Sequence, residues 1–156
     1  MLLLVAFALA LYGTTIRPGR AAQTLPADPA LADQYLQARD DWSARTPQSL
    51  HKSMTEFGEV VSRDPTFAPA YAGLAEDYIA AHDYAGLSGS EAFPKAEAAA
   101  RAALANDPRN ADAFRVLGFI DYWGHQDLGA ARRDFGRALQ LEPASAETHF
   151  WFGSTL

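Results

Sequence analysis

The chain has 156 residues, a formal net charge of −6, 49% hydrophobic residues and 21% charged residues. This is the balance of a folded domain rather than of a disordered chain. The net negative charge argues against nucleic-acid binding, which depends on Lys and Arg at the phosphates, and the absence of cysteine excludes disulfides, thiolate nucleophiles and cysteine metal sites.

An apolar segment opens the chain. Residues 2–16 carry no charge, and the run from Leu2 to Tyr12 is unbroken. As a helix, residues 1–16 would span about 24 Å, which is short of the roughly 20 apolar residues of a membrane span and long for a signal-peptide core of roughly 7–15 residues. We expect a membrane helix, with a cleaved signal peptide and a buried helix as the alternatives. Residues 17–29, rich in Pro, Ala and small polar residues, are expected to form a linker.

Three acid–proline steps divide the remainder, at Pro65, Pro108 and Pro143, with spacings of 43 and 35 residues. Small or apolar residues recur 12, 8, 5 and 4 positions before each proline. The three sets are Ser53, Phe57, Val60 and Val61; Ala96, Ala100, Ala103 and Leu104; and Ala131, Phe135, Ala138 and Leu139. Steps of three and four residues place each set on one face of a helix, which the proline then ends.

A second pattern follows each proline: an aromatic residue or His, then a larger apolar residue and a small one. The copies are Tyr71, Leu74, Ala75 and Tyr78; Phe114, Leu117, Gly118 and Asp121; and His149, Phe152, Gly153 and Leu156, with a weaker copy at Tyr35, Ala38, Arg39 and Trp42. The repeating unit is therefore helix, turn, helix. Gly118, Ala131 and Ala138 are expected where two helix backbones approach closely, with Phe114 and Phe135 filling the space between them.

This order of residues resembles the tetratricopeptide repeat. The resemblance implies an all-α fold, a tetratricopeptide-type α-solenoid of antiparallel helix pairs preceded by the N-terminal apolar membrane helix. Residues 30–156 would hold about three repeats and the first helix of a fourth, which we interpret as truncated. The expected helices are 30–44, 47–63, 67–82, 92–106, 111–124, 127–141 and one from 145 onward.

Two details of the helix boundaries follow from capping residues. Thr46 before Pro47 predicts a helix start. The surplus of the 43-residue unit is expected in a loop within residues 82–94, with Ser90 as the N-cap of the next helix.

Some phrases carry a narrower resemblance. Residues 35–39 (Tyr-Leu-x-Ala-Arg), 45–50 (Arg-Thr-Pro-x-Ser-Leu), 70–75 (Ala-Tyr-Ala-Gly-Leu-Ala) and 91–96 (Glu-Ala-Phe-Pro-Lys-Ala) resemble the repeat region of CadC-like, membrane-bound winged-helix transcriptional regulators of bacteria. The resemblance implies a place in the bacterial inner membrane with a periplasmic repeat domain. No winged-helix, cyclase or kinase motif occurs in the chain, so the resemblance gives this chain no DNA-binding role of its own.

The residues that invite a catalytic interpretation have simpler explanations. His82-Asp83 and His125-x-Asp127 lie at expected turns between paired helices, and no His-Glu-x-x-His zinc pattern is present. The adjacent acids Asp40-Asp41 and Glu76-Asp77 point to different faces of their helices and are expected to be solvated. We expect no catalytic residues, no cofactor and no metal.

The first helices of stacked repeats line a concave groove, where a protein or peptide partner would bind. The residues expected to face it are Asp33, Leu36, Asp40, Ala72, Glu76, Ile79, Arg115, Phe119, Tyr122, Trp123 and Phe150. Packing of Phe119, Tyr122 and Trp123 against the neighbouring helix pair is the alternative. The Asn and Lys set by which some such repeats hold a terminal carboxylate is missing.

The sequence therefore predicts a non-catalytic protein-interaction scaffold, tethered to the membrane by its N-terminal helix. The alternative is the sensory portion of a membrane-bound winged-helix regulator whose DNA-binding domain is absent from this chain. Self-association through an exposed C-terminal helix is a further expectation.

Overall fold

A computed structural model describes residues 25–156, so the expected membrane helix (1–16) and most of the expected linker (17–29) lie outside the described residues. Within them the chain forms α1 (Pro29–Ala44), α2 (Pro47–Arg63), α3 (Ala68–Tyr84), α4 (Gly89–Asn106), α5 (Ala111–Ile120), the π-helical turn η1 (Asp121–His125), α6 (Leu128–Leu141) and α7 (Ala146–Gly153). None of these helices is long and apolar enough to cross a membrane.

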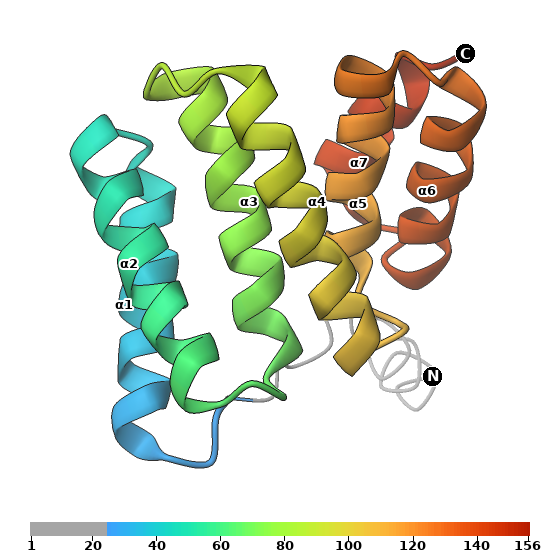
Figure 1. Cartoon of the computed structure of the whole chain (residues 1–156). Helices are drawn as coiled ribbons and strands as arrows, with labels where there is room; N and C mark the ends of the chain where they lie inside the picture. The colour runs from blue at the N-terminus through green and yellow to red at the C-terminus, as the bar shows by residue number, and fades with distance from the viewer. Residues whose placement is uncertain (1–24) are drawn as a thin grey trace, which may run out of the picture.

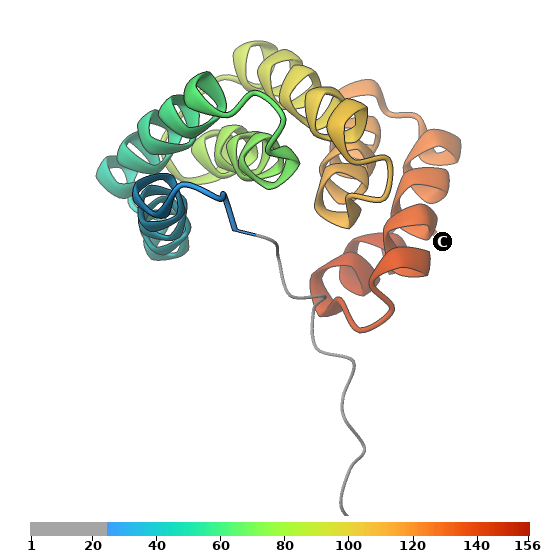
Figure 2. The ribbon, with the colours of Figure 1, turned by 90° about the horizontal axis from the view of Figure 1, so that it is seen from below.

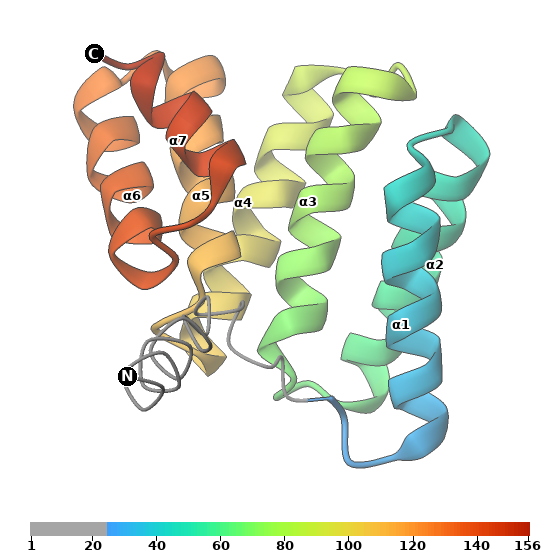
Figure 3. The same ribbon diagram turned by 180° about the vertical axis from the view of Figure 1, so that it is seen from behind.

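The helices stack as antiparallel pairs in chain order (Figure 1). Viewed from below, the stack curves into an arc, with α1, α3, α5 and α7 on the inner side and α2, α4 and α6 on the outer side (Figure 2). From behind, α1, α3 and α7 lie nearest the viewer (Figure 3). The all-α solenoid expected from the repeat is confirmed.

Polar side chains fix where most helices begin. Thr46 and Ser49 form a reciprocal capping box ahead of α2, each side chain bonding the other's backbone N–H at 3.1 Å. Asn110 and Asp127 accept hydrogen bonds from the backbone of α5 and α6, each at 2.9 Å. The helix start predicted at Thr46-Pro47 is confirmed.

The connection between α3 and α4 differs from the prediction. It spans only residues 85–88, so the surplus of the 43-residue unit lies in two long helices of 17 and 18 residues rather than in a loop. Gly86 adopts a φ of 74°, and the N–H of Leu87 donates to the Ala81 carbonyl at 3.1 Å, which closes the turn quickly.

The N-cap predicted at Ser90 is wrong, because α4 already begins at Gly89. Pro94 lies inside α4, near its N-terminus. A proline there removes only one hydrogen bond, to the carbonyl of Ser90, and Ser90 is exposed to solvent. Gly89 and Pro94 therefore do not break α4.

The core contains the alanine and phenylalanine ladders that the sequence indicated. Phe135 is fully buried, and a Cβ added to Gly118 would come within 2.8 Å of its ring. Ala131 and Ala138 beside it are at most 1% exposed. The predicted close approach of α5 and α6 is confirmed. A matching contact joins neighbouring repeats, where a Cβ on Gly73 would lie 2.5 Å from the ring of Phe57.

Candidate functional site

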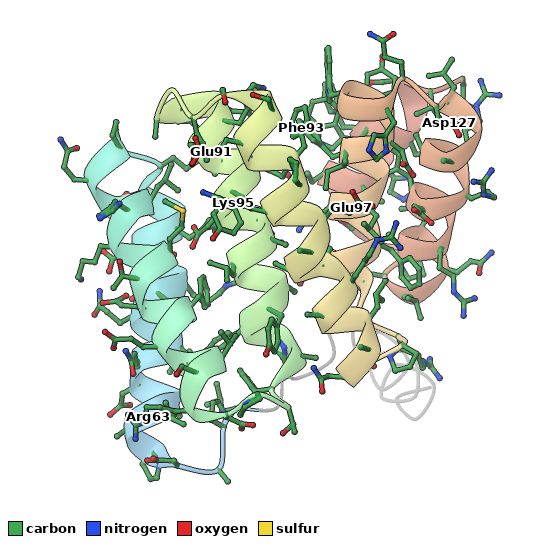
Figure 4. All side chains as sticks on the ribbon, viewed as in Figure 1. Arg63, Glu91, Phe93, Lys95, Glu97 and Asp127 are labelled. Carbon is green, nitrogen blue, oxygen red and sulfur yellow. The ribbon has the colours of Figure 1, made fainter. Side chains whose placement is uncertain are left out.

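The inner helices enclose a hollow of about 940 Å³. Its lining comes from α1, α3, α5 and α7, from the last residue of α6 and from the turns before α5 and α7; it includes Arg39, Trp42, Glu76, Asp112, Arg115 and Glu147. The first helices of successive pairs therefore form one part of the wall, and the two turns form the rest. The outer helices carry ordinary solvated pairs instead, such as Glu91 and Lys95 on α4, 2.8 Å apart (Figure 4).

An ion-pair network crosses the floor of this hollow. Arg115 of α5 contacts Glu76 of α3, with Asp112 at 3.1 Å and Glu147 of α7 at 3.3 Å. Arg39 of α1 lies 3.7 Å from the other Glu76 oxygen. Because α1, α3, α5 and α7 all contribute, the network ties the four inner helices together.

The network shifts the pKa values of Arg115 and Glu76. Burial by itself would lower the pKa of Arg115, but Glu76, Asp112 and Glu147 outweigh that effect and raise it. Arg115 is therefore a permanent cation. Burial raises the pKa of the Glu76 carboxyl, while the guanidinium groups of Arg115 and Arg39 oppose that rise.

The expectation that Glu76 and Asp77 are solvated is wrong. Glu76 is 5% exposed and Asp77 is fully buried. An amphipathic helix with one covered face leaves one of two adjacent acids in water, but α3 packs against α2 on one side and against α4 and α5 on the other. Of the other pair, Asp40 is exposed, whereas Asp41 is partly buried and accepts a 2.6 Å hydrogen bond from Lys52.

A smaller cleft of about 90 Å³ adjoins the hollow, toward the ends of α1 and α3. Aromatic side chains from four inner helices line it: Trp42, Tyr84, Phe119 and Trp151. Glu76, Asp83 and Glu147 add carboxylates, and Arg45 and Arg115 add guanidinium groups. Phe119 and Trp151 meet edge to face with ring centroids 5.2 Å apart.

The predicted groove residues fall into four groups. Glu76 and Arg115 line both hollows, and Ile79 and Phe119 line the cleft. Asp33, Leu36 and Asp40 are exposed on α1 but line neither hollow. Ala72 is 2% exposed and belongs to the core between α3, α4 and α5.

The remaining predicted residues form an aromatic edge beyond the cleft. Trp123 is 53% exposed, and its ring centroid lies 5.1 Å from that of Tyr122 and 6.5 Å from that of Trp151. Phe150 is 65% exposed and lies 4.9 Å from Trp151. Phe119 is 8% exposed and packs against Ala131 and Phe135 of its own helix pair and also against Phe93 of the preceding pair, with ring centroids 6.5 Å apart. Tyr122 joins the same cluster partly buried. Trp123 instead remains largely in solvent.

Among the lining residues that the sequence analysis did not predict are Arg39, Trp42, Arg45, Tyr84, Asp112, Glu147 and Trp151. Two signals pointed to some of them. Asp112 and Arg115 are spaced i, i+3 with opposite charge. Arg39, Trp42 and Arg45 recur every third residue, which places them on one side of the end of α1.

The two histidine motifs have structural roles. His82 Nδ1 lies 2.9 Å from the Leu87 carbonyl and its ring meets Phe93 edge to face. His125 Nδ1 lies 3.0 Å from Asp121. Among residues 25–156, no group of three or more His, Asp or Glu side chains could hold a metal ion.

Solved tetratricopeptide-repeat (TPR) domains have the same fold. The Sgt2 TPR domain of Aspergillus fumigatus matches with a TM-score of 0.67 at 16% identity, covering 88% of this chain and 82% of that chain. The TPR domain of Arabidopsis OM64 matches at 0.65 with 17% identity, over 81% of this chain and 93% of that chain. The second TPR domain of human RPAP3, solved with the HSP70 peptide SGPTIEEVD, matches at 0.60 with 17% identity, over 80% and 97%.

Comparison of the sequence with known families and proteins gives no match. No protein-family model matches the chain, and no curated protein sequence does either. The fold is therefore that of a TPR domain, established by structural likeness alone.

Proposed function

We propose that this domain is a non-catalytic interaction module that binds a peptide or protein segment in its concave groove. The observation that carries the proposal is the hollow of about 940 Å³ beside the inner helices, whose lining includes Trp42, Arg39 and Arg115. Tight protein interfaces usually centre on such anchors. The RPAP3 domain that shares this fold was solved with a chaperone peptide bound, which supports the same use of the fold here.

The HSP70 peptide of the RPAP3 domain is a poor candidate for this groove. The peptide bound by RPAP3 ends in Glu-Glu-Val-Asp. The two hollows of this chain are lined by six acidic residues against four basic ones; the acids are Glu76, Asp83, Asp107, Asp112, Glu142 and Glu147, and the bases are Arg39, Arg45, Arg109 and Arg115. Like charges facing each other across an interface disfavour binding. The partner segment is expected to be neutral or basic.

Selection from a random peptide library tests the proposal. The full chain in detergent micelles is the bait, and selected 12-residue peptides are then measured by fluorescence anisotropy. Ala144→Trp places a bulky ring in the larger hollow from an exposed turn, and it should weaken binding at least tenfold. Ala98→Trp is the matched control, because Ala98 is exposed on the outer helix α4 and lines neither hollow. Equal binding by both variants, or no selected peptide at all, would overturn the proposal.

We also propose that the apolar segment 1–16 tethers the domain to a bacterial inner membrane, with the repeats in the periplasm. The support is the uncharged run of residues 2–16. Alkaline carbonate washing of membranes that contain the full chain should leave it in the pellet, whereas release into the supernatant contradicts the tether. An open reading frame running upstream into a winged helix would favour the regulator alternative.

Self-association is proposed for the aromatic edge. Phe150 of α7, Trp123 of η1 and Leu156 after α7 are 65%, 53% and 83% exposed, so together they offer an apolar surface. Sedimentation of the full chain should show concentration-dependent dimers that Phe150→Ser weakens. A monomer at all concentrations would contradict this proposal without affecting the groove.

A further inference from the structure

The cleft beside the groove has room for one side chain. Its volume of about 90 Å³ is far below the roughly 300–1,000 Å³ of pockets that enclose a small-molecule ligand. Its walls are aromatic, with Trp42 from α1, Tyr84 from α3 and Trp151 from α7, and carboxylates of Asp83, Glu76 and Glu147 are among its lining. Aromatic faces together with nearby carboxylates are the surroundings that favour a cationic side chain.

The chain already places a guanidinium group in this setting. Arg45 lies over the Trp42 ring at 5.0 Å from its centroid and over the Tyr84 ring at 5.6 Å. Its Nη1 also donates to the Tyr84 hydroxyl at 3.2 Å. The geometry of Trp42 and Tyr84 therefore suits a planar cation between two rings.

The backbone gives no reason for an arginine at this position. Arg45 ends α1 with a φ of 49°, in the left-handed region where glycine is preferred. It is an exposed residue, and the cap bond from its N–H to the Trp42 carbonyl needs no side chain. What the Arg45 side chain does is fill the space between Trp42 and Tyr84.

We propose that this cleft is the specificity site of the groove and takes one Arg or Lys side chain of a bound peptide, with Arg45 at its edge as the cation that already lies over two of its rings in the free chain. This inference rests on the proposed function, because it names the chemistry of the segment that the groove binds. The excess of acids over bases along the two hollows favours the same positively charged partner.

Arg45 competes with the incoming side chain because it is attached to the cleft and so has a high effective concentration there. A peptide cation must displace it or share the rings with it. Removing the Arg45 side chain should therefore strengthen cation binding, which is the opposite of what loss of an ordinary groove contact would do.

The test uses a probe small enough to report on the cleft alone. N-acetyl-arginine methylamide is titrated into the full chain, with N-acetyl-citrulline methylamide as its neutral isostere. The indole N–H signals of the three tryptophans are followed by NMR. The Trp42 signal should shift with the arginine probe, and the Trp123 signal should not, because Trp123 does not line the cleft. The citrulline probe should bind at least about fivefold more weakly.

Four variants separate the proposal from simpler explanations. Arg45→Gly should tighten binding of the arginine probe about threefold to tenfold, and adding Tyr84→Leu to it should remove that gain. Gln126→Gly controls for the backbone, because Gln126 has a φ of 56° and lines neither hollow. Arg109→Gln controls for charge, because it removes a cation from the larger hollow only. Neither control should match the gain from Arg45→Gly.

The outcomes separate this inference from the proposed function. Equal binding of the arginine and citrulline probes, or weaker arginine binding by Arg45→Gly, overturns the cation site. If the library then still yields peptides that Ala144→Trp blocks, the groove stands and only its proposed specificity fails. Selected peptides enriched in Asp and Glu rather than Arg and Lys would also overturn the inference while leaving the groove intact.

Discussion

Glu76 and Asp77 are adjacent residues of α3, both buried, and their surroundings differ completely. Glu76 faces the concave side, where it contacts Arg115 and lies 3.7 Å from Arg39. Asp77 lies against α2, where its hydrogen-bond partner is the hydroxyl of Ser53 at 2.8 Å. The comparison shows two ways to bury a carboxyl group in one helix: balance it with cations, or keep it neutral.

The hydrogen bonds around Asp77 fit a neutral side chain. Ser53 Oγ lies 2.8 Å from Asp77 Oδ2 and 2.9 Å from the Ala38 carbonyl, but one hydroxyl proton cannot serve both acceptors. A proton on Asp77 resolves this, because Asp77 then donates to Ser53 and Ser53 donates to Ala38. Burial, the largest influence, raises the pKa of Asp77 to about 8.

Arg115→Leu removes the cation that balances the buried Glu76. This change leaves Glu76 buried beside only the more distant Arg39, and it should lower the free energy of unfolding by about 3–5 kcal/mol, the usual cost of stranding one partner of a buried ion pair. Urea unfolding followed by circular dichroism measures the loss.

The double variant Arg115→Leu with Glu76→Leu is the control. It removes Glu76 together with its cation and should recover part of the lost stability, whereas Asp112 and Glu147 lose their contact with Arg115 in both variants. A loss below about 1 kcal/mol for Arg115→Leu alone would mean that water reaches Glu76 and that the network is solvated.

Asp77→Asn tests whether Asp77 is buried as a neutral carboxyl group. The folded-state pKa of Asp77 is raised to about 8 from 3.8, so between these values the folded chain holds a proton that the unfolded chain has released. Stability therefore falls as the pH rises from about 4 to about 8 and then levels off. Asn cannot ionise, so Asp77→Asn should remove this dependence and stabilise the chain by about 2–4 kcal/mol at pH 7.

The measurement is the free energy of unfolding at several pH values for both chains. The difference between them isolates Asp77 from other groups with raised pKa values, such as Asp134, whose pKa burial raises to about 6. A difference that does not change between pH 4 and pH 8 would show that Asp77 is ionised in the folded chain.

The two acids also show what sequence could and could not predict. Residues that repeat along the chain were predictable: the ladder of Ala131, Phe135 and Ala138 and the close approach at Gly118 depend on spacing within one helix pair. The surroundings of Glu76 depend on Arg115, which lies 39 residues away, and on how far successive pairs rotate. Periodicity along one helix holds no information about that rotation.

The predicted boundary between α3 and α4 was wrong for a local reason. Gly86, Gly89 and Pro94 each favour a break in a helix. The structure shows that Gly86 makes the turn, that α4 begins at Gly89, and that Pro94 lies inside α4 near its N-terminus. The cleft was missed because Tyr84 and Trp151 lie at positions that the repeat pattern does not mark, and because the pattern gives Trp42 only as a member of its weaker copy.

Ser53→Ala should have the smallest effect on stability, because it removes the hydroxyl between Asp77 and Ala38 without altering any charge. An unpaired Asp77 hydroxyl in the core should cost about 1–2 kcal/mol at pH 6. Ser43→Ala is the matched control, since Ser43 is exposed and bonds only the Asp40 carbonyl, at 2.7 Å. A loss of stability no larger than that of Ser43→Ala would show that the neutral Asp77 carboxyl does not depend on the Ser53 hydroxyl as its hydrogen-bond partner.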